Sequence, residues 1–305
     1  MGMIDLSVQI GSAVLPNPIG VASGTFGYGS EYEQLIDLSR LGALYTKAVT
    51  LLPRPGNEMP RIIETPAGIL NSIGLANCGV ELFLKEKVPR MEQFKCPIIA
   101  NVAGSTQDEY CKVIERLETD DVLWGYEINV SCPNVKHGGL AFGTDSQQIE
   151  RLTSDLRKRT HKPLIVKLTP NVTDITQIAR ATEQGGADAI SCINTCIGMV
   201  IDVENKRPFF AMKTGGLSGP AIRPIGVALT YKVSRSVAIP VIGMGGIASV
   251  DDALQYFLAG AAAIQIGTGN FIDPSLPSTI LEGVEEFCQK ENVSAVSRLS
   301  RLMVE

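Results

Sequence analysis

Short runs of aliphatic and β-branched residues alternate along the chain with longer segments in which apolar residues recur every three or four positions. The first pattern is typical of strands buried on both faces, and the second of amphipathic helices packed against them. Eight such runs predict an α/β fold of the (β/α)8 TIM-barrel class. The predicted strands are Ile19–Ser23, Ala43–Ala48, Pro97–Val102, Tyr126–Val130, Leu164–Leu168, Ala189–Asn194, Val241–Gly245 and Ala263–Gly267.

The remaining segments predict an outer ring of helices and three additions to the barrel. Leu6–Leu15 predicts an N-terminal hairpin, turned around Gly11 and Ser12, that plugs the lower end of the barrel. Leu52–Leu75 and Ile197–Ser218 are too long for simple loops, so we expect these rim insertions to fold over the upper end as candidate lids. The predicted helices are Tyr32–Leu38, Glu81–Phe94, Thr106–Leu117, Ser146–Arg159, Thr173–Thr182, Ile222–Val233, Val250–Leu258 and Leu276–Cys288.

The composition indicates a globular protein with one core. Hydrophobic residues make up 45% of the 305 positions and charged residues 19%, and no linker divides the sequence. We therefore expect residues 1–305 to form a single domain. The net charge of −5, with scattered Lys and Arg, argues against a nucleic-acid partner. No apolar stretch reaches about 18 residues, so we expect no membrane association and a cytoplasmic location.

The seven cysteines include no C-x-x-C pair. This spacing argues against a disulfide framework and against a zinc or iron–sulfur site within the chain. Any metal cluster that serves this protein would therefore lie elsewhere.

Polar or glycine residues follow every predicted strand, at the end of the barrel where barrel enzymes hold their chemistry. Gly245-Gly246 and Gly267-Thr268 follow the last two strands. Barrels commonly bind a phosphate there through backbone N–H groups. The two pairs predict a phosphorylated cofactor or substrate, and the alternative is that the glycines only form tight turns.

Lys47 and Lys167 occupy strand ends that point toward a largely apolar interior. A buried ammonium is costly unless it meets an anion, so each lysine implies a negatively charged partner. Flavin mononucleotide would supply its phosphate and the negative charge that develops on its reduced ring. Alternatively, each lysine extends to solvent at the rim.

Asn71, Asn101, Asn129, Asn134 and Asn194 lie on loops and strand ends. An amide side chain offers both a donor and an acceptor to a planar ring of imides and carbonyls, as in a pyrimidine. A single asparagine is more often a turn former, so only their convergence argues for a binding site.

A cysteine-containing loop, Asn129-Val-Ser-Cys-Pro-Asn-Val135, follows the fourth strand. It combines with an earlier segment, Asn71-Ser-Ile-Gly-Leu-Ala-Asn77, and with motifs from end to end of the chain. In this ensemble the chain closely resembles the dihydroorotate dehydrogenase family. The further motifs are Val21-Ala-Ser-Gly-Thr-Phe-Gly27, Thr46-Lys-Ala-Val-Thr50, Val166-Lys-Leu-Thr-Pro170, Ile193-Asn-Thr195, Gly215-Gly-Leu-Ser-Gly-Pro220, Ile242-Gly-Met-Gly-Gly-Ile247 and Ile266-Gly-Thr-Gly269.

The resemblance implies a role for each matching residue. Cys132 would be the general base that takes a proton from C5 of dihydroorotate, while hydride leaves C6 for N5 of FMN; taken alone, any one cysteine is more often a buried structural thiol. Contacts to dihydroorotate or orotate are implied for Lys47, Asn71, Ser72, Ile73, Gly74, Leu75, Asn129, Asn134, Asn194 and Thr195. Contacts to one FMN per chain are implied for Ser23, Lys47, Ala48, Asn101, Asn129, Lys167, Ile193, Gly219, Gly245, Gly246, Gly267 and Thr268.

The segment Val135-Lys-His-Gly-Gly-Leu-Ala-Phe-Gly143 resembles the NAD-linked class of the family. That likeness implies a homodimer paired with a second subunit that carries FAD and a [2Fe-2S] cluster, giving a heterotetramer for pyrimidine biosynthesis. The fumarate-linked class is the near alternative. A dihydropyrimidine dehydrogenase-like barrel and a non-catalytic phosphate-binding barrel are the others.

Overall fold

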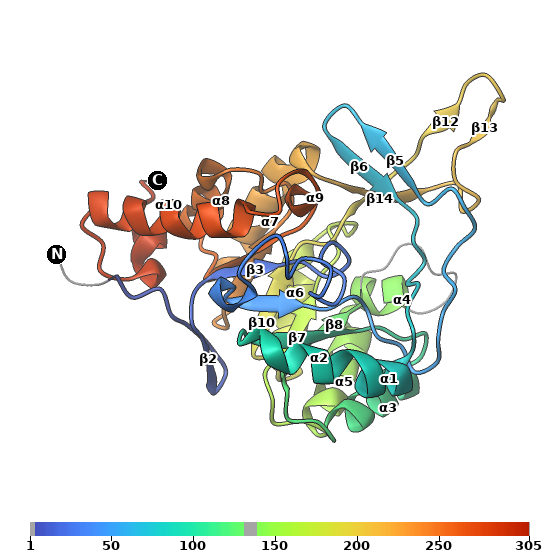
Figure 1. Cartoon of the computed structure of the whole chain (residues 1–305), viewed down its shortest axis with the longest axis horizontal. Coiled ribbons are helices and arrows are strands. Elements are labelled where there is room, and N and C mark those ends of the chain that lie inside the picture. The colour runs from blue at the N-terminus through green and yellow to red at the C-terminus, as the bar shows by residue number, and fades with distance from the viewer. Residues whose placement is uncertain (1–3, 131–138, 305) are drawn as a thin grey trace.

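The computed structural model describes residues 4–130 and 139–304. Eight parallel strands form a closed barrel, as predicted, in the order β10-β15-β16-β3-β4-β7-β8-β9. Helices cover it on the outside, and both termini lie at the end away from a small additional sheet (Figure 1). The barrel strands are β3 (Ile19–Val21), β4 (Ala43–Tyr45), β7 (Ile98–Val102), β8 (Leu123–Asn129), β9 (Leu164–Lys167), β10 (Ala189–Cys192), β15 (Val241–Met244) and β16 (Ala263–Ile266).

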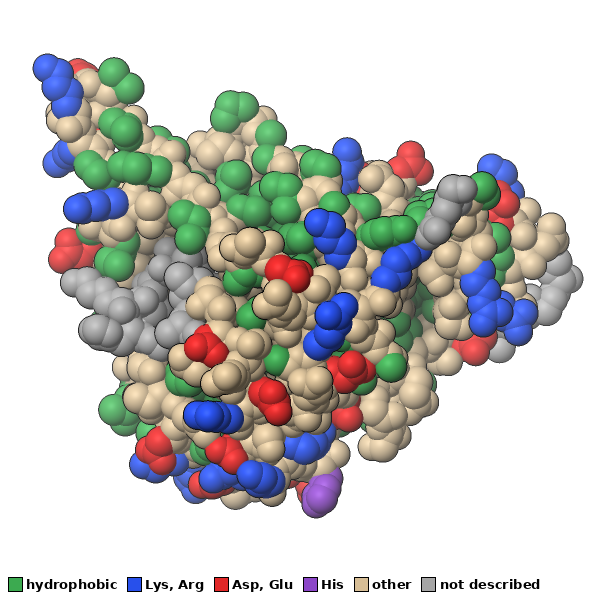
Figure 2. Space-filling view, turned by 180° about the vertical axis from the view of Figure 1, so that it is seen from behind, with side chains coloured by type: hydrophobic (Ala, Val, Ile, Leu, Met, Phe, Trp, Pro, Cys, Tyr) green, Lys and Arg blue, Asp and Glu red, His purple; other side chains and the backbone are tan. Residues whose placement is uncertain are grey.

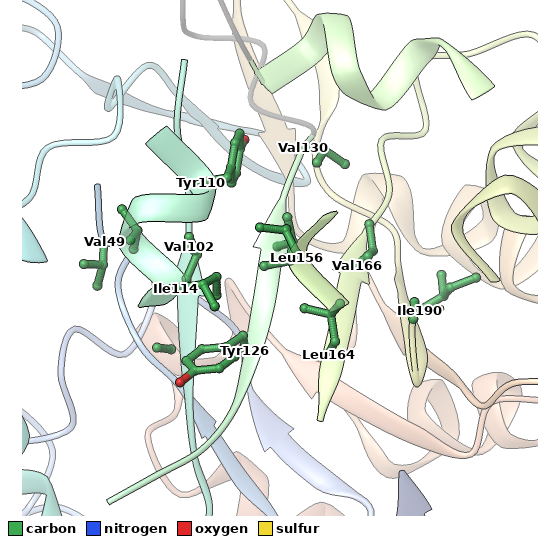
Figure 3. Packing of buried hydrophobic residues seen from close by; sticks show 14 of the residues in the cluster. Val49, Val102, Tyr110, Ile114, Tyr126, Val130, Leu156, Leu164, Val166 and Ile190 are labelled. Atoms are coloured by element: carbon green, nitrogen blue, oxygen red, sulfur yellow. The ribbon is translucent and has the colours of Figure 1, made fainter. Parts of the chain in front are cut away.

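Barrel strands are buried on both faces, which explains their nearly continuous apolar sequence. Outward-facing side chains such as Tyr126, Leu164 and Val166 pack with helix side chains such as Ile114 and Leu156 (Figure 3). Because successive side chains on a strand point to opposite faces, the alternate positions of β8 and β9 point into the barrel. This alternation decides which polar residues reach the interior.

Six of the predicted helices form as α3 (Gln107–Leu117), α5 (Ser146–Arg157), α6 (Ile175–Gln184), α7 (Arg223–Ser234), α8 (Val250–Leu258) and α10 (Leu276–Lys290). Four of them begin after a Thr, Asp or Ser whose side chain accepts a hydrogen bond from a backbone N–H of the first turn. The predicted helix Glu81–Phe94 is a chain of short pieces: α1 (Val80–Leu82), η2 (Phe83–Lys87), α2 (Val88–Met91) and η3 (Glu92–Phe94). Short elements not predicted are α4 (Gly139–Thr144), α9 (Gly269–Ile272), η4 (Pro220–Ile222) and η5 (Val296–Leu302).

The predicted helix Tyr32–Leu38 is wrong. The segment consists of turns followed by the short helix η1 (Leu38–Arg40). Tyr32 stacks on Phe26 with 3.7 Å between ring centroids, and its hydroxyl donates to the carbonyl oxygen of Thr25. These contacts hold the chain back against the preceding loop, and a seven-residue segment is too short to favour a helix without tertiary support.

The predicted N-terminal hairpin is confirmed as β1 (Val8–Ile10) and β2 (Ala13–Leu15). Ile10 and Leu15 are buried among residues that begin the barrel strands, including Ile19 and Ala43. A side chain at Gly11 would collide with Asp188, which directly precedes β10. The hairpin therefore plugs the end of the barrel where the strands begin.

The two predicted rim insertions meet in one antiparallel sheet of order β11-β14-β6-β5. Its strands are β5 (Ile62–Thr65), β6 (Gly68–Asn71), β11 (Cys196–Gly198) and β14 (Gly215–Ser218). A smaller hairpin, β12 (Ile201–Asp202) and β13 (Arg207–Pro208), extends furthest from the barrel (Figure 1). Pairing of β6 with β14 joins segments that are far apart in sequence.

Within the described residues, no three His, Cys, Asp or Glu side chains are grouped as metal ligands would be. No helix of this part of the chain combines the length and the hydropathy that crossing a membrane requires.

Candidate active site

A cavity of about 270 Å³ lies at the carboxyl ends of the barrel strands. Loops after the strands form its floor and walls, and residues of β5, β6 and β14 roof it. Its lining is mainly apolar with a few convergent polar groups, as in most small-molecule sites. The described residues that line it are Ala22, Ser23, Gly24, Thr25, Lys47, Ala48, Ile62, Ile69, Asn71, Ile73, Gly74, Leu75, Ala76, Asn129, Lys167, Ile193, Asn194, Thr195, Ser218, Gly219, Ile222, Met244, Gly245, Gly246, Gly267, Thr268 and Phe271.

Most of the site residues predicted from sequence are brought together in this cavity, although they come from the ends of seven barrel strands, from the insertion Leu52–Leu75 and from Gly219, just after the second insertion. Ser72 and Asn101 are buried beside it rather than in its wall. Cys132 and Asn134 lie outside the described residues, so their predicted roles remain predictions. The apolar residues Ile62, Ile69, Ile222, Met244 and Phe271 were not predicted, because an apolar lining residue carries no chemical signal in a sequence, and Ser218 was missed as well.

Ser72 points away from the cavity, since its neighbours Asn71 and Ile73 point into it. Its hydroxyl oxygen accepts a hydrogen bond of 3.1 Å from Nδ2 of Asn57, which also donates to the Ser72 carbonyl. This side chain fixes the loop that presents Asn71 and Ile73.

Lys167 is the most deeply buried cation of the cavity wall, with 4% of its surface exposed. Its Nζ lies 3.7 Å from Oε1 of Glu127, beyond ordinary hydrogen-bonding distance. No hydrogen bond from the ammonium to another described residue is present, and the same holds for the half-buried Lys47. Because a buried ammonium needs acceptors, this wall fits an anionic ligand.

The asparagines form a chain of side chains across the cavity floor. Nδ2 of Asn194 donates to Oδ1 of Asn129 at 3.4 Å, and Nδ2 of Asn129 donates to Oδ1 of Asn101 at the same distance. Tyr110 on α3 fixes the strand end, because its hydroxyl donates to the Asn129 carbonyl at 2.8 Å. The amides are thus oriented in advance for a polar planar ring.

Glycines bring the backbone close to the other end of the cavity. Gly246 has φ of +70°, and a Cβ there would lie 2.7 Å from the carbonyl oxygen of Gly219. Gly267 differs, since a Cβ there would meet no atom closer than 3.8 Å and would occupy the cavity itself. Beside it, the hydroxyl of Thr268 donates to Oγ of Ser218 at 2.8 Å. This backbone-lined end suits a bulky polar group such as a phosphate.

A buried polar cluster beneath the floor was missed by the sequence reasoning. It consists of Glu127, Ser191 and Gln265, it is hydrogen-bonded to the predicted Asn101, and Tyr45 lies against it. Burial, and next the negative charge of Glu127, raise the pKa of the Tyr45 hydroxyl. The sequence did contain a signal for this cluster. Glu127 lies inside a strand that is buried on both faces, and a buried carboxylate requires hydrogen-bond donors around it.

The rim sheet also exposes apolar side chains to solvent. Seen from behind in Figure 2, the segment projecting at the upper left carries hydrophobic side chains between charged ones. The exposed apolar residues of the second rim insertion, Ile197–Ser218, include Ile197, Met199, Ile201 and Val203. Nothing in the described part of the chain covers them.

The sequence matches the family model described as dihydroorotate dehydrogenase over residues 5–288. The chain belongs to the dihydroorotate dehydrogenase family. Proteins named "Dihydroorotate dehydrogenase B (NAD(+)), catalytic subunit" are similar to it over nearly their whole length. Those of Geotalea daltonii and Trichlorobacter lovleyi are 48% and 49% identical over 98% and 96% of this chain, covering 98% and 97% of their own.

A crystal structure titled as DHODH in complex with ferulenol, from Eimeria tenella, shares the fold with a TM-score of 0.80. The match covers 96% of this chain and 87% of that one at 21% identity, and it therefore supports the architecture alone. The barrel expected for a dihydroorotate dehydrogenase family member is the barrel found here.

Proposed function

We propose that this chain is the catalytic subunit of an NAD-linked dihydroorotate dehydrogenase, which oxidises dihydroorotate to orotate in pyrimidine biosynthesis. The observation that supports it best is the cavity in which two lysines and a chain of amides meet at the strand ends. The chain also shares 46–49% identity with relatives that carry this name. Their printed name favours the NAD-linked class over the fumarate-linked one.

The residues present fit FMN. Lys167 lacks an acceptor within hydrogen-bonding distance among the described residues, and Gly267 leaves open the space that a Cβ would fill. The proposed holders are the flavin residues named from sequence, with Asn101 acting through Asn129, to which it is hydrogen-bonded. When bound, FMN supplies the acceptor for the hydride. One domain, residues 1–305, is proposed to hold it.

The chain's own residues are assigned the binding and proton-transfer roles. Asn71, Asn129, Asn194 and Thr195 orient the dihydropyrimidine through its carbonyl and imide groups, and Lys47 faces its negative charge. Asn71 is held by a hydrogen bond of 3.2 Å from its Nδ2 to the Gly216 carbonyl. Cys132 is proposed to take the C5 proton. A thiol with a reference pKa of about 8.5 needs only a modest shift to act as a base near neutral pH.

A partner subunit with FAD and a [2Fe-2S] cluster is part of the proposal. Support comes from the words "catalytic subunit" in the names of the relatives, which imply a further subunit in those proteins. We propose a homodimer of this chain that binds two such partners as a heterotetramer. The proposed location is the cytoplasm, where NAD⁺ is available as acceptor.

The purified chain tests the core of this proposal. We expect a flavin absorption spectrum that dihydroorotate bleaches in the absence of air, while uracil leaves it unchanged. Bleaching by uracil would instead indicate a dihydropyrimidine dehydrogenase-like enzyme. A colourless chain that binds phosphate but no flavin would overturn the proposal.

A further inference from the structure

Glu127 lies in the interior of the barrel, directly beneath the cavity floor, with 0% of its surface exposed. Oε1 accepts a hydrogen bond of 2.6 Å from Nδ2 of Asn101. Oε2 accepts bonds of 2.7 Å from Oγ of Ser191 and from Nε2 of Gln265. Each near neighbour is therefore a donor, which is the environment of an ionised carboxylate.

The strand register places the Glu127 carboxylate next to two residues that connect it with the cavity, Lys167 and Asn101. Glu127 is paired with Asn101 across β7 and β8, and Lys167 is paired with both Asn129 and Ser191 on its two sides. Nζ of Lys167 lies 3.7 Å from Oε1 of Glu127. Asn101 receives the amide of Asn129 and donates its own to Glu127. A change at Glu127 thus reaches the cavity by two routes.

The positive charge of Lys167 and the negative charge of Glu127 have opposite effects on a bound ring, and water does not screen either of them. The side chains of Lys167 and Glu127 are 5% and 0% exposed. An ammonium in the wall favours added negative charge on a bound ring, and a carboxylate behind it opposes that effect. Passing electrons on to NAD⁺ requires a donor of low potential, which the carboxylate favours.

We propose that Glu127 is a positioning residue that orients Lys167 and Asn101 and lowers the reduction potential of the flavin held above them. This inference rests on the proposed function. It predicts that loss of the carboxylate charge makes the flavin easier to reduce and a weaker reductant.

The decisive measurement is the flavin reduction potential of Glu127→Gln, obtained by anaerobic equilibrium titration against a reference dye. We expect the reduced-to-oxidised ratio at a fixed potential to rise at least tenfold, which is about 30 mV for a two-electron couple. Glu118→Gln is the matched control, because that carboxylate accepts hydrogen bonds of 2.6 Å from the Tyr126 and Thr160 hydroxyls and does not line the cavity. Its potential is expected to equal that of the wild type.

A flavin-loaded Glu127→Gln with the wild-type potential would overturn the inference and leave the proposed function standing. A wild-type chain without flavin would overturn both. If Glu127→Gln does not retain flavin, Glu127→Asp is measured instead. The aspartate keeps the negative charge but moves it away from Lys167 and Asn101. We therefore expect weaker flavin binding than in the wild type, measured by fluorescence titration. We also expect a flavin potential that rises above the wild-type value by less than the shift predicted for Glu127→Gln.

A double-mutant cycle with Lys167→Met isolates the pair. If the two side chains act together, the effect of Glu127→Gln on the potential changes when Lys167 is absent. Strict additivity of the two shifts would contradict the coupling through Lys167.

Discussion

Lys167 and Glu127 show that the position of a residue along a strand determines whether its side chain points into the barrel. Each follows an outward-facing apolar residue, Val166 or Tyr126, and therefore points into the barrel. The hydrophobic pattern of a strand thus also selects which polar side chains reach the cavity. Lys167 was predicted from its place at a strand end, whereas Glu127 requires the strand order around the barrel, because its partners come from β7, β10 and β16.

Cys132 carries the first prediction. Cys132→Ala is expected to retain flavin and to slow flavin reduction by dihydroorotate about 10²- to 10⁴-fold, the usual contribution of a positioned base. Stopped-flow absorbance without air measures this rate. Cys132→Ser is expected to exceed the alanine variant only at high pH, because a hydroxyl gives up its proton less readily.

Cys96 provides the control for that experiment. Burial raises the pKa of its thiol to about 12, so it is not a thiolate near neutral pH. Cys96→Ala should reduce flavin at the wild-type rate. Equal rates for Cys132→Ala and the wild type would show that another group removes the proton.

Gly267 carries the second prediction. Gly267 lines the cavity, and a Cβ added there would lie no closer than 3.8 Å to the neighbouring side chains. Gly267→Val should therefore unfold at the wild-type temperature but bind FMN at least about tenfold more weakly, or about 1.4 kcal/mol. Fluorescence titration of the flavin-free chain measures this affinity. Wild-type affinity in this variant would place the cofactor elsewhere.

The hairpin β1–β2 and the rim sheet lie at opposite ends of the barrel and have different roles. Asp188, beneath the hairpin, accepts hydrogen bonds from Arg157 at 2.6 Å and from the Leu164 backbone at 2.8 Å. No residue of the hairpin lines the cavity. In barrels, the end where the strands begin serves stability, whereas the other end serves chemistry.

Ile10 tests this division of roles. Ile10→Ala removes a fully buried side chain from the plug and should lower the free energy of unfolding by about 2–5 kcal/mol, as measured in urea. The flavin potential and the rate of flavin reduction should not change. Val14→Ala is the control on the same hairpin, since its half-exposed side chain should cost about 0.5 kcal/mol or less. Altered flavin chemistry in Ile10→Ala would contradict the separation.

The elements also show what a sequence pattern can and cannot predict. All eight barrel strands were predicted, because burial on both faces leaves a continuous apolar run that differs from a helix in length. The segment Tyr32–Leu38 has helical spacing, but the Phe26–Tyr32 stack determines its conformation instead. The pairing of β6 with β14 was not predicted, since contacts between distant segments leave no local periodic signal.

The whole molecule combines a closed barrel with one open end. Its two large hydrophobic clusters both include barrel strands, which supports the proposal of a single domain. The cavity opens between the strand ends and the rim sheet, so a substrate or an electron acceptor must enter it from that side.

Transfer to NAD⁺ tests the proposed assembly. With dihydroorotate, the purified chain should reduce a soluble dye at a steady rate, but it should reduce NAD⁺ only after an FAD/[2Fe-2S] subunit is added. The reason is that NAD⁺, a two-electron acceptor, must reach the flavin directly to take a hydride from it, whereas the proposed substrate site places a pyrimidine against the flavin in this cavity. Cys132→Ala in the reconstituted complex should slow both activities about 10²- to 10⁴-fold while leaving assembly, measured by light scattering, unchanged. NAD⁺ reduction by the chain alone would remove the need for the partner, and turnover with fumarate would place the chain in the fumarate-linked class.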